Sequence, residues 1–114
     1  MKLPAGNRAI VDIRKLRDYC LNPDNPRGSA KARVFARALG ITARDTSTLR
    51  KKLLEVAASE AAEIGELDLY GQRYTIDFAM ETETGKANIR SGWIVLRGER
   101  VPRLTTCYVK KRNR

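Results

Sequence analysis

The sequence contains no histidine, and this absence removes the most familiar routes to metal binding and proton transfer. Histidine is the commonest metal ligand in proteins and the commonest general acid or base. Cysteine is almost absent as well. Cys20 and Cys107 lie far apart in the sequence and form no CxxC pattern, which argues against a zinc site and against a disulfide framework. We therefore expect neither a metal ion nor a cofactor.

Long apolar runs are also missing. No stretch approaches the roughly 20 apolar residues that a membrane span needs, and the first residues lack the apolar segment of a signal peptide. We expect no membrane insertion and a cytoplasmic location, with any delivery to another cell requiring a larger exported protein. Aromatic residues make up only 6% of the chain, so a platform for stacking bases is not prominent.

Positive charge is what the sequence has in abundance. Of 114 residues, 23 are Lys or Arg and 13 are Asp or Glu, which gives a net charge of +10. Residues 1–52 hold 13 basic and 4 acidic residues, residues 53–86 hold 2 and 8, and residues 87–114 hold 8 and 1. If the first and last blocks meet in the fold, they form one basic face. Such a face suits nucleic acid, an anionic membrane surface or an acidic protein.

Hydrophobic periodicity predicts helices in the first half of the chain. One helix over about residues 12–21 has Asp12 as its N-cap, and a second over about 29–39 ends before Gly40. A third helix over about 46–63 begins at Asp45 or Thr46. Its apolar stripe runs from Leu49 and Leu53 to Ile64.

From residue 66 the hydrophobic period changes to two, which is typical of strands. One strand places Tyr74, Ile76, Phe78 and Met80 on one face and Arg73, Thr75, Asp77 and Ala79 on the other. A hairpin loop at 81–86 leads to a strand over 87–96, and a last strand spans 101–109. We predict an α+β domain over residues 1–109, followed by a basic tail at 110–114. In it, two or three N-terminal helices pack on a three- or four-stranded antiparallel meander.

The start of the second helix is a candidate anion site. Gly28 permits a close approach of the backbone, and Ser29 is expected to cap the helix through its hydroxyl. Backbone N–H groups at a helix start carry partial positive charge, and Lys31 adds a full charge there. The alternative is that Lys31 is one more solvated lysine on a basic helix.

Short motifs along nearly the whole chain resemble a poorly characterised bacterial domain family. They are Leu3-Pro4, Ala9-Ile10-Val11-Asp12, Lys15-Leu16, Tyr19, Asn22-Pro23, Pro26, Gly28, Lys31-Ala32, Phe35, Leu39-Gly40, Tyr70-Gly71, Tyr74, Trp93-Ile94 and Pro102-Arg103-Leu104-Thr106. That family is met as small stand-alone proteins and at the C-termini of polymorphic toxins. The order of helices and strands is similar to that of the barnase, EndoU, colicin and RelE type of ribonuclease toxin. Members often carry histidine where this chain has Asn25 and Ala30, which puts their proton-transfer chemistry in doubt here.

The resemblance and the charge together suggest a metal-independent ribonuclease. Attack by the ribose 2′-hydroxyl needs a base, an acid for the leaving oxygen and positive charge on the phosphate. The candidate catalytic residues are Lys31 to hold the phosphate, Arg90 and Arg103 to stabilise developing charge, Thr106 to donate a hydrogen bond, and Tyr74 or Tyr108 to transfer protons. The candidate nucleic-acid-binding residues are Arg27, Ser29, Arg33, Arg73, Lys110 and Lys111.

Two other functions fit the same charges. A nucleic-acid-binding module without catalysis needs only the two basic blocks, because phosphate contacts give affinity without sequence reading. A toxin-like protein that uses its basic face mainly to dock an acidic immunity or antitoxin partner fits them equally. For the strand arginines Arg90 and Arg103, a role as solvated side chains is the alternative to catalysis.

Overall fold

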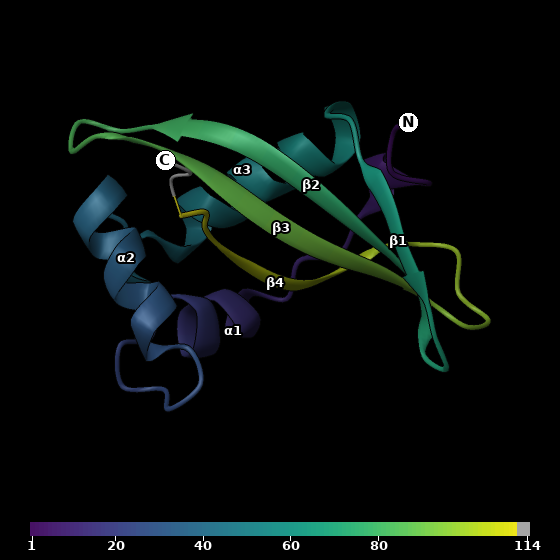
Figure 1. Ribbon diagram of the computed structural model, residues 1–114, viewed down its shortest axis with the longest axis horizontal. Coiled ribbons are helices and arrows are strands. Elements are labelled where there is room, and N and C mark those ends of the chain that lie inside the picture. Colours follow the sequence, from purple (N-terminus) through teal and green to yellow (C-terminus); the bar gives the residue numbers. More distant parts are fainter. Residues whose placement is uncertain (112–114) are drawn as a thin grey trace.

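The computed structural model describes residues 1–111, in which helical segments precede a four-stranded sheet (Figure 1). The helical segments are η1 (Gly6–Arg8), α1 (Ile13–Lys15), the π-helical turn η2 (Leu16–Cys20), α2 (Ser29–Leu39), η3 (Ala43–Asp45) and α3 (Thr46–Ser59). The strands are β1 (Glu63–Leu67), β2 (Gly71–Glu81), β3 (Lys86–Leu96) and β4 (Arg103–Val109). The predicted α+β class is confirmed: N-terminal helices are followed by an antiparallel meander.

The sheet has the order β1-β2-β3-β4, and every neighbouring pair is antiparallel. β2 and β3 form a long hairpin in which Tyr74 pairs with Trp93 and Asp77 with Arg90. In Figure 1, α3 runs behind the sheet and α2 lies beside the end of β4. The helices therefore cover one face, which we call the inner face, and the opposite side is the outer face.

Alternating residues of the strands build the core against these helices. Trp93, Ile76 and Ile89 of the inner face are at most 1% exposed, as are Phe35 of α2 and Leu53 of α3. The indole N–H of Trp93 donates to the Ser91 hydroxyl, which donates to the Ile76 carbonyl, both at 2.9 Å. The polar atoms in this buried layer are thus satisfied, as a buried layer requires.

The third helix ends earlier than its apolar pattern predicts. α3 stops at Ser59, and Ile64 lies in β1 with 63% of its surface exposed, so its predicted place in the helix core stripe was wrong. The N-terminus accounts for the difference: Ala62 donates its N–H to the Met1 carbonyl, and Lys2 bridges to Ala61. This pairing draws a locally helix-favouring segment into an extended conformation.

The helix caps agree with prediction in one case and differ in another. The Asp12 carboxylate accepts the backbone N–H of Arg14 at 2.9 Å and caps α1 as predicted. Ser29 is the first residue of α2 rather than its cap; the N-cap is Gly28, and no side chain of residues 1–111 caps this end. The Ser29 prediction was wrong because the preceding loop, and not the serine hydroxyl, satisfies this helix end.

Within residues 1–111, no helix is both long enough and apolar enough to cross a membrane.

Candidate anion-binding site

A hydrogen-bonded loop positions the start of α2, where Lys31 lies. The side-chain oxygen of Asn25 accepts the backbone N–H groups of Arg27 and Gly28, at 2.9 and 3.1 Å. A Cβ atom at Gly28 would collide with the carbonyl oxygen of Tyr19, so glycine is needed for the loop to pack this closely on η2. The close approach predicted for Gly28 is therefore confirmed. It fixes the direction in which α2, and with it Lys31, leaves the loop.

Lys31 meets the sheet at Tyr108, and five residues around this contact form what we call the Tyr108 cluster. The Lys31 Nζ lies 4.6 Å from the centroid of the Tyr108 ring, within cation–π range. Tyr108 is opposite Arg90 in the β3–β4 pair, and Arg90 is opposite Asp77 in the β2–β3 pair. These three alternate with inner-face residues and therefore share the outer face. Lys110, two residues after Tyr108, completes the cluster.

Asp77 links the cations of the cluster. The Arg90 Nε and Nη2 donate to its two carboxylate oxygens at 2.9 Å each, and the Lys110 Nζ lies 3.0 Å from Oδ2. Hydrogen bonds from Arg90 lower the pKa of the Asp77 carboxyl to about 2. Desolvation acts in the opposite direction, and the hydrogen bond from Lys110 lowers the pKa further. The bonds to Asp77 also raise the pKa of Arg90. Asp77 is therefore ionised at neutral pH, and together with Lys31 the cluster keeps a net positive charge.

Thr106 adds a polar atom without a partner beside the cluster. It faces Gly92 across the β3–β4 pair, next to the Arg90–Tyr108 pair. Its Oγ1 is buried and has no hydrogen-bond partner among the residues that the structure describes. Leaving a buried hydroxyl unpaired costs about 1–3 kcal/mol, and such atoms in native proteins usually have water or a ligand as partner. The hydroxyl predicted to donate to a phosphate thus lies beside the cations and has its bonding capacity unused.

The structure does not bring Arg103 into the cluster. Arg103 pairs with Ile94, four residues along β3 from Arg90, which is about 13 Å at the rise of a strand. Its Nε lies 3.0 Å from Glu99. The expectation that Arg90 and Arg103 act on the same phosphate is therefore not met, because the strand register separates them.

Arg73 lies at this same distant end of the outer face. It is opposite Ile94 in the β2–β3 pair, and its Nε lies 2.7 Å from Asp68. Adjacent strands carry Arg73, Arg90 and Arg103 as expected, but each guanidinium has its own carboxylate partner.

Tyr74 is on the wrong face for proton transfer at the cluster. Its side chain is in the core, 8% exposed, and it pairs with Trp93 on the inner face. Tyr108, the other tyrosine that the sequence suggested for this role, has its ring beside Lys31 and Arg90. The strict alternation of β2 places Tyr74 and Asp77 on opposite faces, so this outcome follows from the pattern once the inner face is known.

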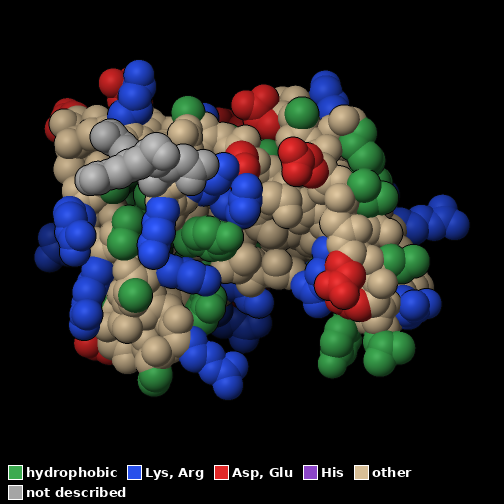
Figure 2. Space-filling view, in the orientation of Figure 1, with side chains coloured by type: hydrophobic (Ala, Val, Ile, Leu, Met, Phe, Trp, Pro, Cys, Tyr) green, Lys and Arg blue, Asp and Glu red, His purple; other side chains and the backbone are tan. Residues whose placement is uncertain are grey.

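The remaining predicted binding residues surround the start of α2 and the end of β4. Arg27, Arg33 and Lys111 are exposed, Ser29 is half-buried, and Lys110 is held by Asp77. Figure 2 shows Lys and Arg side chains gathered on this part of the surface, over α2 and the end of β4. The last three residues of the predicted basic tail, 112–114, lie outside the described residues. Basic residues of the first and last charge blocks therefore lie together around the start of α2 and the end of β4.

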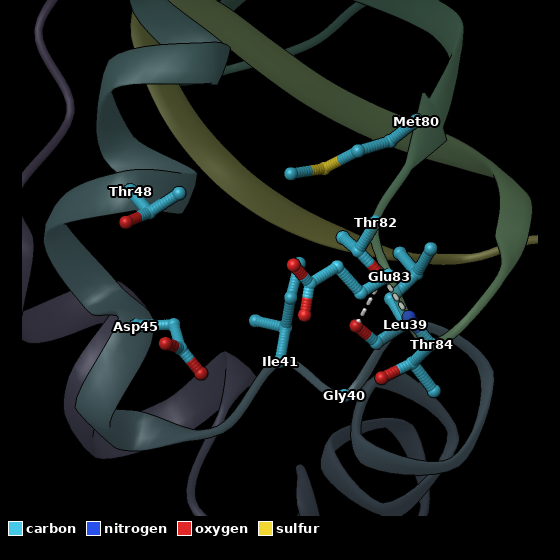
Figure 3. Close-up of a pocket in the computed structure, with 9 residues that line it drawn as sticks. All are labelled: Leu39, Gly40, Ile41, Asp45, Thr48, Met80, Thr82, Glu83 and Thr84. Atoms are coloured by element: carbon cyan, nitrogen blue, oxygen red, sulfur yellow. Dashed lines mark hydrogen bonds between the residues drawn. The ribbon is translucent and has the colours of Figure 1, made fainter.

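Two hollows flank the helices, and they differ in charge. One of about 250 Å³ lies between the end of α2 and the β2–β3 hairpin, and Figure 3 shows Asp45 and Glu83 among its lining residues. Its carboxylates make it unsuitable for a phosphate. The other, of about 280 Å³, lies between α2 and η3 and has Arg33 and Arg44 on its rim. Within residues 1–111, no three acidic or cysteine side chains are grouped so as to hold a metal ion.

Asp77 and Arg44 are the residues of these sites that sequence reasoning did not select. Alternation placed Asp77 on the wet face of its strand, but nothing local indicates that Arg90 and Lys110 both reach it. Arg44 stands in a turn segment that the sequence pattern left without an assignment.

The fold is also found in a protein complex of known structure. A chain of the structure described as "Contact-dependent growth inhibition toxin - immunity protein complex from Klebsiella pneumoniae 342" superposes with a TM-score of 0.68 at 14% sequence identity. The match covers 89% of this chain and 99% of that chain. At such low identity the likeness establishes the fold alone. The chain belongs to the family described as "Domain of unknown function (DUF6883)", whose profile matches residues 2–111. No curated protein matches it.

Proposed function

We propose that this chain is a bacterial toxin-type domain that binds RNA at the Tyr108 cluster and cleaves it without a metal ion. The observation that carries the proposal is the meeting of Lys31, from the first basic block, with Arg90 and Lys110, from the last, around one tyrosine. The structural likeness to a chain from a complex of a growth inhibition toxin with its immunity protein supports the toxin class. Action in the cytoplasm, after delivery within a larger exported protein, belongs to the same proposal.

The proposed reaction is an internal transfer at phosphorus. The ribose 2′-oxygen attacks the phosphorus and loses its proton, while the bond from phosphorus to the 5′-oxygen breaks and that oxygen gains a proton. The products are a 2′,3′-cyclic phosphate and a 5′-hydroxyl. Lys31 and Arg90 stabilise the negative charge that develops on the phosphate oxygens, and Thr106 donates a hydrogen bond to them. The Tyr108 hydroxyl, on the face where these cations lie, donates the proton that the 5′-oxygen gains, and water accepts the proton that the 2′-hydroxyl loses and returns one to Tyr108.

Asp77 is assigned a positioning role in this reaction. Its carboxylate makes two bonds to Arg90 and one to Lys110, and its pKa of about 2 keeps it ionised at neutral pH. A carboxylate with so low a pKa is a poor proton acceptor near pH 7. It fixes the direction of the Arg90 guanidinium instead.

Cleavage of labelled total RNA in the presence and absence of EDTA tests the proposal. We expect fragments with cyclic phosphate ends in both conditions. Lys31→Ala should reduce the cleavage rate by about 100-fold, the usual effect of losing one charge-stabilising group. Tyr108→Phe keeps the ring beneath Lys31 but removes the hydroxyl, so it should lower cleavage while leaving the midpoint of urea unfolding unchanged.

Arg37→Gln is the matched control, because Arg37 is an exposed arginine of the same helix that forms no ion pair within residues 1–111. Its cleavage rate should equal that of the unmodified protein. RNA that stays intact with stoichiometric protein would refute the ribonuclease proposal. Full activity in Lys31→Ala would refute the assignment of cleavage to the Tyr108 cluster.

A second candidate function is RNA binding without cleavage. The ion pair between Asp77 and Arg90 favours this function. The Asp77 carboxylate neutralises part of the positive charge of Arg90, which would otherwise stabilise the transition state of cleavage. In this case intact RNA is retained in a salt-dependent manner.

A third candidate is docking of an immunity or antitoxin protein, and it has a surface to support it. Four of the large exposed hydrophobic residues lie in β1 or in the β1–β2 turn: Ile64, Leu67, Leu69 and Tyr70. Arg97 holds this turn by donating to the carbonyls of Leu69 and Asp68, at 2.9 and 3.1 Å. Exposed apolar patches of this kind are typical of protein interfaces. An acidic partner that instead covers the basic face would compete with RNA.

A further inference from the structure

The hollow between α2 and η3 is lined by apolar residues and by two arginines without acidic partners among residues 1–111. Leu21, Pro23, Ala32 and Ala36 contribute to the floor, and Arg33 and Arg44 stand at the rim of a volume of about 280 Å³. Within residues 1–111, neither guanidinium is within ion-pair distance of a carboxylate, whereas five other arginines are. Both arginines are exposed and line the hollow, so their charges are accessible to an anion that enters it.

This combination matches the chemistry of a nucleotide. A nucleobase is a flat ring system whose faces are apolar, and it can lie against the alanine methyl groups and Leu21. Its phosphate is an anion that a planar guanidinium binds well. Typical ligand pockets have volumes of roughly 300–1,000 Å³. The volume of this hollow, about 280 Å³, is at the small end and suits a ligand with one ring system. We propose that the hollow binds one nucleotide, with its base on the apolar floor and its phosphate between Arg33 and Arg44.

The position of the hollow on α2 relates it to the Tyr108 cluster. Lys31 and Arg33 are two residues apart, which turns their side chains about 200° around the helix axis. The two side chains therefore project from opposite sides of α2, near its N-terminal end. A strand of RNA crossing this end contacts the Tyr108 cluster on one flank and the hollow on the other, across about 10–12 Å of helix. The inference rests on the proposed function for the identity of the strand, and nucleotide binding tests it separately.

Titration with single nucleotides provides the direct test. Protein labelled with ¹³C at the alanine methyl groups reports on Ala32 and Ala36 in the floor. We expect AMP, GMP, CMP or UMP to shift these signals saturably, with a dissociation constant on the order of 1 mM. Ribose 5-phosphate, which lacks the base, should leave them in place.

Three variants separate the parts of the site. Ala36→Leu puts three carbon atoms into the hollow at an exposed helical position where leucine is well tolerated, and it should abolish the nucleotide-induced shift at Ala32. Arg44→Gln, outside α2, should weaken binding about tenfold, as expected for loss of a charged hydrogen bond. Arg37→Gln removes the same charge from α2 at a residue that does not line the hollow, and it should bind as the unmodified protein does.

The outcomes distinguish this inference from the proposed function. Saturable shifts at Ala32 and Ala36 in a protein that cleaves no RNA would support the nucleotide site and refute only the ribonuclease. Unmoved alanine signals with all four nucleotides would overturn the inference, even if RNA is cleaved. Two further results would also overturn it: equal shifts with ribose 5-phosphate, and shifts caused only by an acidic peptide of alternating glutamate and leucine.

Discussion

At the scale of single residues, Asp77 decides how the charges of the Tyr108 cluster are arranged. It accepts from Arg90 on the neighbouring strand and from Lys110 beyond the end of β4. Without it, three cations would repel one another across the outer face. With it, Arg90 has a fixed direction, and the remaining positive charge is available to an anion. The same carboxylate also makes the stability of the fold depend on pH.

Asp77→Asn should remove part of the acid sensitivity of the protein. The pKa of Asp77 is about 2 in the folded protein against an ordinary value of 3.8, so its stabilising effect is present above 3.8 and disappears as the pH falls through about 2. The side chain is 37% exposed, so screening limits the effect to about 1 kcal/mol or less. Urea unfolding at a series of pH values should give a difference between the variant and the unmodified protein near neutral pH that vanishes in acid.

Asp24→Asn is the control for this experiment, because Asp24 is exposed and forms no ion pair within the described residues. Its difference from the unmodified protein should be small and should not follow the same pH course. A difference for Asp77→Asn that stays constant down to acid pH would contradict the assigned ion pairs.

At the scale of elements, the position of α2 depends on the loop before it. Asn25 closes this loop, and Gly28 packs against the backbone of η2 without room for a side chain. The helix then carries Lys31 toward β4 and Arg33 toward the hollow. Both proposed contacts with RNA therefore depend on where α2 begins.

Gly28→Ala should destabilise the protein and displace the start of α2. The added Cβ meets the Tyr19 carbonyl, so the loop must move; overpacking of this kind costs about 1–3 kcal/mol. We expect a lower midpoint of urea unfolding and, where the variant folds, a shift of the Tyr108 ring signals that report on Lys31. Ser29→Ala is the neighbouring control and should change stability by less than about 0.5 kcal/mol, since the Ser29 hydroxyl caps nothing. Equal stabilities of the two variants would disprove the packing argument.

At the scale of the whole molecule, basic residues from the two ends of the described chain lie together at one end of the sheet. Basic residues of the first and last blocks meet over α2 and the end of β4 (Figure 2). The acidic block, residues 53–86, supplies β1, β2 and Glu83, which lines a hollow together with Asp45. Such a separation gives the molecule a polarity that orients a polyanion toward one face.

The salt dependence of RNA binding should report which cations touch phosphate. Removing one cation that binds a phosphate should reduce the slope of log affinity against log salt by about 0.7 for single-stranded RNA. Lys31→Ala and Lys110→Ala should each show this reduction. Arg103→Ala should leave the slope unchanged, because Arg103 lies outside the Tyr108 cluster, about 13 Å from Arg90. A larger reduction for Arg103→Ala than for Lys31→Ala would place the phosphate site elsewhere on the sheet.

Local pattern was enough to predict much of this fold. The 3.6-residue period and Gly40 predicted the bounds of α2 to the residue, and the two-residue period separated Ile76 and Phe78 from Asp77 on β2. These predictions succeed because side-chain direction in a helix or strand depends only on position along the chain. The predicted end of α3 was wrong, because pairing of the N-terminus with Ala61 and Ala62 overrides the local preference for helix.

The sequence alone therefore determines the class of fold, the basic character of its two ends and the face on which each strand residue lies. Tertiary structure decides which charged residues meet. Strand register brings Tyr108 to Arg90 and leaves Arg103 four residues away, and the packing of α2 on β4 brings Lys31 to the same ring. Such contacts join segments far apart in the chain, so they depend on the fit of whole surfaces rather than on any local period.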